Sequence, residues 1–168
     1  RAGFDFYVYP NELLPITKTF TPYIFTHDEI GSILNDVDHL PHSPISKYYH
    51  LIYPMVFRML YGCGLRINEA LSLKKSEVDL VNGILTITNA KNRTSRLTPM
   101  SWSLTNYCKR YAKNMAFDMA SGGYFYPSRD GGKYHRTPVY VKLKQFMKIA
   151  GIYPEGAVGP RVHDIRHT

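Results

Sequence analysis

The stretch YGCGLRINEALSL, residues 61–73, joins two segments of different character. Residues 45–61 are apolar on most faces, which predicts a buried helix ended by Gly62 and Gly64. Residues 66–73 place isoleucine, alanine and leucine at helical spacing, which predicts a short second helix whose apolar side chains face the core. We expect Pro54 either to kink the longer helix or to mark its true start.

Three further stretches on either side predict helices. A capping-box spacing from Thr26 to Glu29 opens the first of them, ahead of apolar residues at helical period. Residues 101–120 have the same periodicity, and another helix is expected between Thr137 and Gly151. The chain is therefore expected to be mainly helical.

The middle of the chain changes to the periodicity of strands. The dipeptide Asn82-Gly83 between apolar runs predicts a hairpin with residues 84–88 as its second strand, and residues 96–98 predict a third strand. A last helix is expected to begin at residue 163 and to be unfinished at residue 168. The predicted fold class is α+β, mainly helical with one small antiparallel three-stranded sheet.

Composition excludes several classes of protein. Apolar residues make up 44% of the chain and charged residues 20%, which is typical of a globular protein. No apolar run approaches the roughly 18 residues that cross a membrane, and residues 1–10 lack the apolar stretch of a signal peptide. Cys63 and Cys108 have no metal-ligand or disulfide-framework spacing, so we expect free thiols in a reducing compartment.

Positive charge is concentrated in the second half of the chain. Residues 1–80 hold seven Lys and Arg against nine Asp and Glu, a net charge of −2, whereas residues 81–168 hold fourteen against four, a net charge of +10. This asymmetry indicates a face that meets a polyanion, of which nucleic acid is the commonest. A basic, solvated surface without a partner explains the charge equally well.

A charged pair lies at the start of the short apolar helix. A guanidinium in the place of Arg66 is either paired or held at the mouth of a site. Glu69 lies three residues on, on the same helix face, and could orient Arg66. Taken alone, the two residues fit a local surface ion pair better, worth about 0.2–0.5 kcal/mol.

Two other segments carry candidate site residues. Lys91 lies at the tip of the predicted sheet, between strands and near Arg93 and Arg96. His163 and Arg166 share a face in the first turn of the last predicted helix, where unpaired N–H groups favour phosphate. Each segment alone is explained more simply, by a solvated hairpin tip or by a capped helix with a structural histidine.

Together the three segments resemble the tyrosine recombinases of the phage integrase family. That family has an Arg after a glycine turn followed by Glu, a Lys in a β-hairpin, and a His-x-x-Arg box that opens a helix. Here the matches, in the same order, are YGCGLRINEALSL, then Lys91 with an Arg and a Pro ahead of a helix, then HDIRHT at residues 163–168. The stretches FTHDEI and YFYPS are also similar to the family, so the resemblance covers roughly residues 20–168. Each motif alone is weak, but three in order are specific.

The resemblance implies site-specific DNA recombination or integration through a 3′-phosphotyrosyl intermediate, with no cofactor and no metal. Arg66 and Arg166 would hold the phosphate oxygens, Lys91 would protonate the leaving 5′-oxygen, and His163 would bind the phosphate or help deprotonate the tyrosine. These four are expected to converge on one cavity. Supporting roles fall to Glu69 and His167, and contacts with the DNA backbone to Arg93, Arg96, Lys133 and Arg136.

The same resemblance implies a domain layout and partners. Residues 1–25 are interpreted as a linker or the end of an upstream DNA-binding domain, and residues 26–168 as a catalytic domain incomplete at its C-terminus. In the family the nucleophilic tyrosine follows the His-x-x-Arg box, and none of the fourteen tyrosines lies beyond Arg166. The expected partner is double-stranded DNA, with self-association on DNA in the full-length protein, no membrane, and a cytoplasmic location in a bacterium.

Two other functions stay open. A non-catalytic basic DNA-binding domain would be distinguished by whether the gene encodes a tyrosine after the His-x-x-Arg box. A type IB topoisomerase relaxes DNA without exchanging partners, and the continuous GLR-x-x-E spacing argues against it. A metal-dependent nuclease is disfavoured because no cluster of Asp, Glu and His has ligand spacing.

Overall fold

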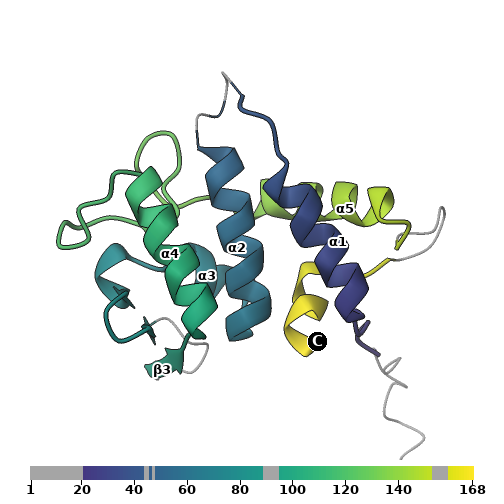
Figure 1. Cartoon of the computed structure of the whole chain (residues 1–168), viewed down its shortest axis with the longest axis horizontal. Helices are drawn as coiled ribbons and strands as arrows, with labels where there is room; N and C mark the ends of the chain where they lie inside the picture. The colour runs from purple at the N-terminus through teal and green to yellow at the C-terminus, as the bar shows by residue number, and fades with distance from the viewer. Residues whose placement is uncertain (1–20, 44–45, 47, 89–94, 153–158) are drawn as a thin grey trace, which may run out of the picture.

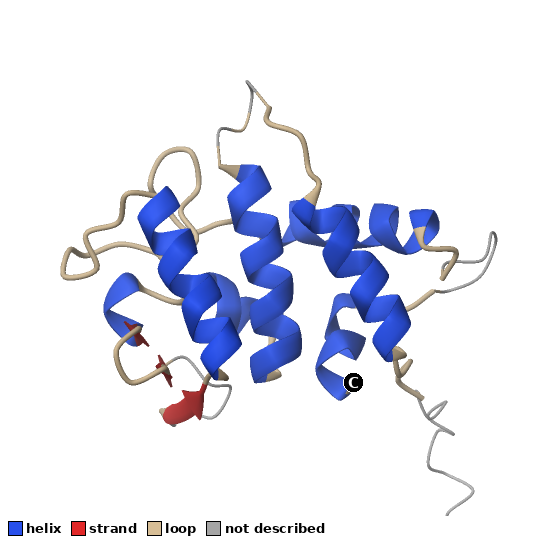
Figure 2. Cartoon of the chain, viewed as in Figure 1, coloured by secondary structure: helices blue, strands red, loops and turns tan. Residues whose placement is uncertain are grey.

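A computed structural model of the chain describes residues 21–43, 46, 48–88, 95–152 and 159–168. Helices dominate it, with one small sheet at one end (Figures 1 and 2). The first helix, α1, spans His27–Asp38, and its N-cap is Thr26. Thr26 and Glu29 make the predicted capping box, with the Glu29 amide donating to the Thr26 hydroxyl and the Thr26 amide to the Glu29 carboxylate.

The helix α2, Tyr49–Cys63, is the central element. It packs against α1 on one side and against α4 on the other (Figure 1). Most of its side chains are buried, as the sequence predicts. Pro54 lies inside the helix, so the expectation that it marks the start is wrong. Gly64 ends the helix with a φ of 56°, a left-handed conformation that glycine adopts without steric cost.

The predicted short helix and sheet follow directly. Helix α3 spans Ile67–Ser72, and the 3₁₀ helix η2 spans Lys75–Glu77. The strands are β1 (Val78–Asp79), β2 (Ile84–Ile87) and β3 (Arg96–Pro99), in the order β1-β2-β3 with both pairs antiparallel. The hairpin is confirmed, with residues 80–83 connecting β1 to β2.

The helix α4 spans Trp102–Asn114, so the prediction that it continues to residue 120 is wrong. The chain leaves the helix at Met115, and Ala116 adopts a φ of 52°. A left-handed conformation is unfavourable for alanine. It is offset here because the turn brings the Phe117 ring against the rings of Tyr111 and Phe125, with centroids 5.7 and 5.9 Å apart.

The last two helices complete the core. Helix α5, Arg136–Ile149, begins close to the predicted Thr137-Pro138 start and crosses behind α1 (Figure 1). The segment with the His-x-x-Arg box forms a 3₁₀ helix, η3 (Val162–His167), between the ends of α1 and α2. Within the described residues, no helix is both long enough and apolar enough to cross a membrane.

Both ends of the described chain join this core. Phe25 is buried in the same hydrophobic cluster as the side chains of α1 and α2. Its amide donates to the hydroxyl of Thr168, 3.1 Å away, so the segment before α1 is tied to the end of η3. The boundary predicted at residue 26 stays a prediction.

Candidate functional site

The site is built around the carboxylate of Glu69, whose side chain is only 3% exposed. The glycine turn at Gly64 places Arg66 as the N-cap of α3, and Glu69 stands three residues on, in the first turn. Glu69 accepts a hydrogen bond from the Arg66 amide at 2.8 Å and another from Arg66 Nη1 at 3.0 Å. Glu69 thus fixes both the start of the helix and the guanidinium that follows the glycine turn.

A second arginine reaches Glu69 from the sheet. Arg96 opens β3, where it lies opposite Ile87 of β2. Its Nη1 donates to Oε1 of Glu69 at 3.0 Å and its Nη2 donates to Oε2 at 2.8 Å. Such a two-bond pair between a planar guanidinium and a carboxylate is among the stronger and more directional ion pairs in proteins.

The third arginine, Arg166, comes from η3. Its Nη1 lies 3.8 Å from Oε2 of Glu69, which is an ion-pair distance but too long for a hydrogen bond. This nitrogen is buried and has no hydrogen-bond partner among the residues that the structure describes. Leaving a charged donor buried and unbonded is costly, so this nitrogen needs an acceptor from beyond the described residues.

Three guanidinium groups therefore face one carboxylate. Burial by itself raises the pKa of Glu69, but the hydrogen bonds from Arg96 and Arg66 outweigh it and lower that pKa to about 2. Glu69 is ionised at neutral pH, and the cluster keeps a net charge of +2 from its three arginines and one carboxylate. An unbalanced positive charge of this kind, built into a partly buried site, favours a phosphate group.

Two histidines lie on the same 3₁₀ helix as Arg166. The rings of His163 and His167 have centroids 6.0 Å apart. The pKa of His163 is lowered by burial first, and then by the neighbouring charges of Arg166, His167, Arg66 and Arg161. His163 is therefore neutral at neutral pH and can either accept or donate one proton at its ring nitrogens.

The structure brings together most of the residues that the sequence singled out. Arg66, Glu69 and Arg166 meet, and His163 lies close enough to feel the charges of both arginines. Lys91 and Arg93 lie outside the described residues, and the expected convergence of Arg66, Lys91, His163 and Arg166 on one cavity stays a prediction.

The remaining expected DNA contacts fall in different places. Lys133 donates to the hydroxyl of Ser72 at 2.5 Å, whereas Arg136 is exposed at the start of α5. Arg96 is bound to Glu69. Sequence reasoning named Arg96 as a DNA contact and missed this pairing. No local pattern reveals a bond between β3 and α3.

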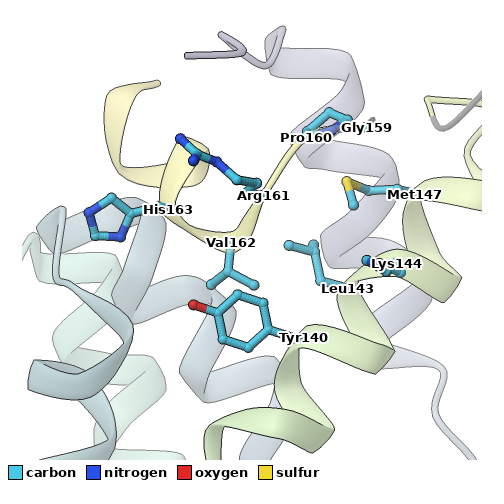
Figure 3. Close-up of a pocket in the computed structure, with 9 residues that line it drawn as sticks. All are labelled: Tyr140, Leu143, Lys144, Met147, Gly159, Pro160, Arg161, Val162 and His163. Atoms are coloured by element: carbon cyan, nitrogen blue, oxygen red, sulfur yellow. The ribbon is translucent and has the colours of Figure 1, made fainter. Parts of the chain in front are cut away.

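A cavity of about 470 Å³ lies between α5 and the segment that leads into η3 (Figure 3). Its lining is largely apolar, with Leu143 and Met147 from α5 facing Val162. His163 stands at its edge. The cavity is lined by none of Arg66, Glu69 and Arg166, so it is separate from the candidate phosphate site.

Comparisons with known proteins agree on one family. Residues 24–168 match the model of the phage integrase family. The protein y4rB of Sinorhizobium fredii, named as an integrase/recombinase, is 33% identical over 95% of this chain and 52% of its own length. Tyrosine recombinase XerA of Pyrococcus furiosus is 31% identical over 68% of this chain and 38% of its own. The chain thus spans about half the length, or less, of these relatives.

Solved structures have the same fold. The crystal structure of XerA recombinase superimposes with a TM-score of 0.66 at 19% identity, covering 92% of this chain and 50% of that one. A lambda integrase dimer bound to a COC′ core site gives a TM-score of 0.66 at 15% identity, covering 92% of this chain and 41% of that one. At these identities the likeness concerns the fold alone.

Proposed function

The chain belongs to the phage integrase family, and on that basis we propose that it is part of a tyrosine recombinase and holds the scissile phosphate while that enzyme cuts and rejoins DNA. The observation that carries this proposal is the convergence of Arg66 and Arg166 on Glu69, with Nη1 of Arg166 buried and unbonded within the described structure. One bound phosphate would give that nitrogen its missing acceptor.

The chemistry of the proposed reaction needs such a site. The phenolic oxygen of a tyrosine gives up its proton and attacks phosphorus, and the bond from phosphorus to the 5′-oxygen breaks. The 5′-oxygen leaves as a hydroxyl, and the 3′-phosphate stays bound to the tyrosine. Because a phosphotyrosyl ester bond replaces the broken phosphodiester bond and conserves its energy, rejoining needs no external energy source. Negative charge builds on the two non-bridging oxygens, where positioned guanidinium groups stabilise the transition state.

The other roles follow the family pattern. Lys91 would protonate the leaving 5′-oxygen, and neutral His163 would hydrogen-bond the phosphate or receive the tyrosine's proton. The attacking tyrosine would come after the His-x-x-Arg box in chain order. Tyr111 and Tyr126 do not suit this role, since both are buried in the core and burial holds the pKa of each well above its usual value.

Partners follow from the same proposal. Double-stranded DNA would lie against the arginine cluster, with Arg93, Lys133 and Arg136 on its backbone, where contacts set position and not sequence. Supporting roles fall to Glu69 and His167. We also propose that the whole protein self-associates on DNA and works in the cytoplasm, where chromosomal DNA is reached.

Covalent capture of DNA tests the proposal. The protein expressed from its complete gene is mixed with a duplex that carries a nick near the cleavage point, and the adduct is measured on a denaturing gel. Arg66→Ala and Arg166→Ala should each lower the rate of adduct formation by about 100-fold or more, as removal of an oxyanion-stabilising donor does.

The matched control is Arg58→Ala, because Arg58 makes a similar two-bond pair with Asp38 on α1 and should be dispensable for cleavage. DNA binding without any adduct would instead support the non-catalytic domain and overturn the proposal. If the rate of adduct formation fell only a few-fold in both arginine variants, Arg66 and Arg166 would be surface charges that do not hold the phosphate.

A further inference from the structure

We propose that Arg96 is a positioning residue of the phosphate site. Arg96 occupies hydrogen-bond acceptor sites of Glu69, and it thereby leaves an N–H donor of Arg166 available to a phosphate. The inference rests on the proposed function of Arg66 and Arg166. It gives Arg96 a role that acts through Glu69, and therefore differs from a direct contact with the DNA backbone.

The acceptor count at Glu69 carries the argument. A carboxylate has about four lone-pair sites, two on each oxygen. Oε1 accepts from Nη1 of Arg66 and Nη1 of Arg96, each at 3.0 Å. Oε2 accepts from the Arg66 amide and Nη2 of Arg96, each at 2.8 Å. All four sites are taken, and Arg96 takes two of them.

The consequence is visible at Arg166. Its Nη1 lies 3.8 Å from Oε2, which is close enough for electrostatic attraction. No lone pair of Oε2 is left to accept a hydrogen bond from it. The nitrogen is buried and unbonded within the described residues. Because Arg96 takes the two acceptor sites of Glu69 that Arg66 leaves open, Arg166 is kept near the carboxylate and yet available to another anion.

Without Arg96, two lone pairs of Glu69 would be open. Moving less than 1 Å would then bring Nη1 of Arg166 into hydrogen-bond distance of Oε2. The Nη1 donor of Arg166 would then be engaged with Glu69, and that bond would have to break before this nitrogen could bind a phosphate. The Glu69 carboxylate would thus compete with the phosphate for Arg166.

Arg96 is suited to this task by its place in the sheet. It is paired with Ile87 across β2 and β3, so its backbone is fixed by the sheet while its side chain reaches α3. The other carboxylate near Glu69, that of Glu77, does not compete for Arg96. It accepts from the Lys74 amide and from the Thr88 hydroxyl.

The first test uses Arg96→Met, which keeps the aliphatic length of the side chain and removes every donor. In a crystal structure of that variant, the distance from Arg166 Nη1 to Glu69 Oε2 should shorten from 3.8 Å to about 3 Å. A distance that stays at 3.8 Å, or lengthens, overturns the inference. The pKa of the Glu69 carboxyl, measured by carbon NMR, should also rise above about 2.

The second test is kinetic. In the protein from the complete gene, Arg96→Met should slow covalent capture of DNA by roughly 10- to 100-fold, the effect of losing one hydrogen bond to a charged group. Arg96→Lys keeps the charge but cannot make two parallel bonds, so it should rescue only in part. Arg58→Met is the matched control, because it removes an equivalent pair with Asp38 and should leave the rate unchanged.

A double-variant cycle separates positioning from direct DNA contact. If Arg96 acts through Glu69, adding Arg96→Met to Glu69→Gln should slow cleavage little further. If Arg96 binds DNA itself, the two effects should multiply, and the inference fails. Failure of the proposed function would look different, because either no adduct would form or Arg66→Ala and Arg166→Ala would each slow its formation only a few-fold.

Discussion

The guanidinium of Arg166 lies 3.8 Å from the carboxylate of Glu69, near enough for attraction and too far for a hydrogen bond. The two residues come from elements far apart in the sequence, α3 and η3, and the packing of α2 against η3 brings them together. One contact thus links the glycine-turn motif to the His-x-x-Arg box. Glu69 is the residue through which the separate sequence motifs become one site.

Glu69→Gln should lower the free energy of unfolding by about 3 kcal/mol, because a buried ion pair that loses one partner leaves the other uncompensated. The value is at the low end of the usual range since Arg66 and Arg96 are 39% and 36% exposed. Urea denaturation measures it. Asp38→Asn, which removes the more exposed partner of Arg58, is the control and should cost about 1 kcal/mol or less. If Glu69→Gln and Asp38→Asn lowered the free energy of unfolding equally, the ion pairs of Glu69 would stabilise the fold no more than an exposed pair does.

Acid should remove the contribution of Glu69 in a defined window. The usual pKa of this carboxyl is 4.5 and that in the folded chain is about 2, so between these values the unfolded state binds the extra proton. The stabilisation is complete above pH 4.5 and is lost as the pH falls toward 2. The difference in unfolding free energy between the wild type and Glu69→Gln should therefore narrow across this window. A constant difference would mean that Glu69 titrates normally.

His163 should titrate below the usual histidine value of 6.5, because burial and the surrounding cations disfavour its charged form. The unfolded chain then protonates this ring more readily, so its contribution to stability is present above pH 6.5 and is lost as the pH falls below that value, toward the lower pKa of the folded chain. Proton NMR of the ring measures the pKa directly. Arg166→Gln should raise it, whereas Arg58→Gln, on α2 and paired with Asp38, should not. A wild-type value of 6.5 or higher would contradict this environment.

DNA binding by the chain should weaken steeply with salt. The net charge of +10 over residues 81–168 provides the contacts, and each neutralised phosphate adds about −0.9 to the slope of log K against log salt. Arg136→Gln should make the slope shallower by about one such unit, since Arg136 is exposed at the start of α5. Arg58→Gln serves as the charge-matched control. Binding that does not change with salt would exclude a backbone interface.

Local sequence patterns predicted the elements of this fold well. Thr26 and Glu29 form the capping box that their spacing predicts, and Gly64 adopts the left-handed turn that ends α2. The overestimate of α4 has a local cause of another kind. Its apolar residues keep helical spacing past Asn114, but Phe117 gains more by turning back onto Tyr111 than by continuing the helix. Apolar periodicity therefore predicts which residues are buried, but it does not always predict the backbone conformation that buries them.

The site shows the same division. Arg66 and Glu69 are three residues apart, so their contact could be expected from the sequence. The bond between Arg96 and Glu69 depends on the register of β3 against β2 and on the packing of the sheet beside α3, which no spacing in the sequence encodes. The strength of these ion pairs also could not be predicted from the sequence. It depends on how deeply Glu69 is buried, because exposed ion pairs contribute little to stability.

The structure of the protein bound to its DNA substrate tests the central claim most directly, through the distances from Arg66 and Arg166 to the scissile phosphate. We expect both guanidinium groups within about 2.7–3.2 Å of non-bridging oxygens on one phosphate, with Nη1 of Arg166 bonded and Glu69 still held by Arg96. Arginines that contact two different phosphates, or an Arg166 that is bonded to Glu69 and not to DNA, would contradict it.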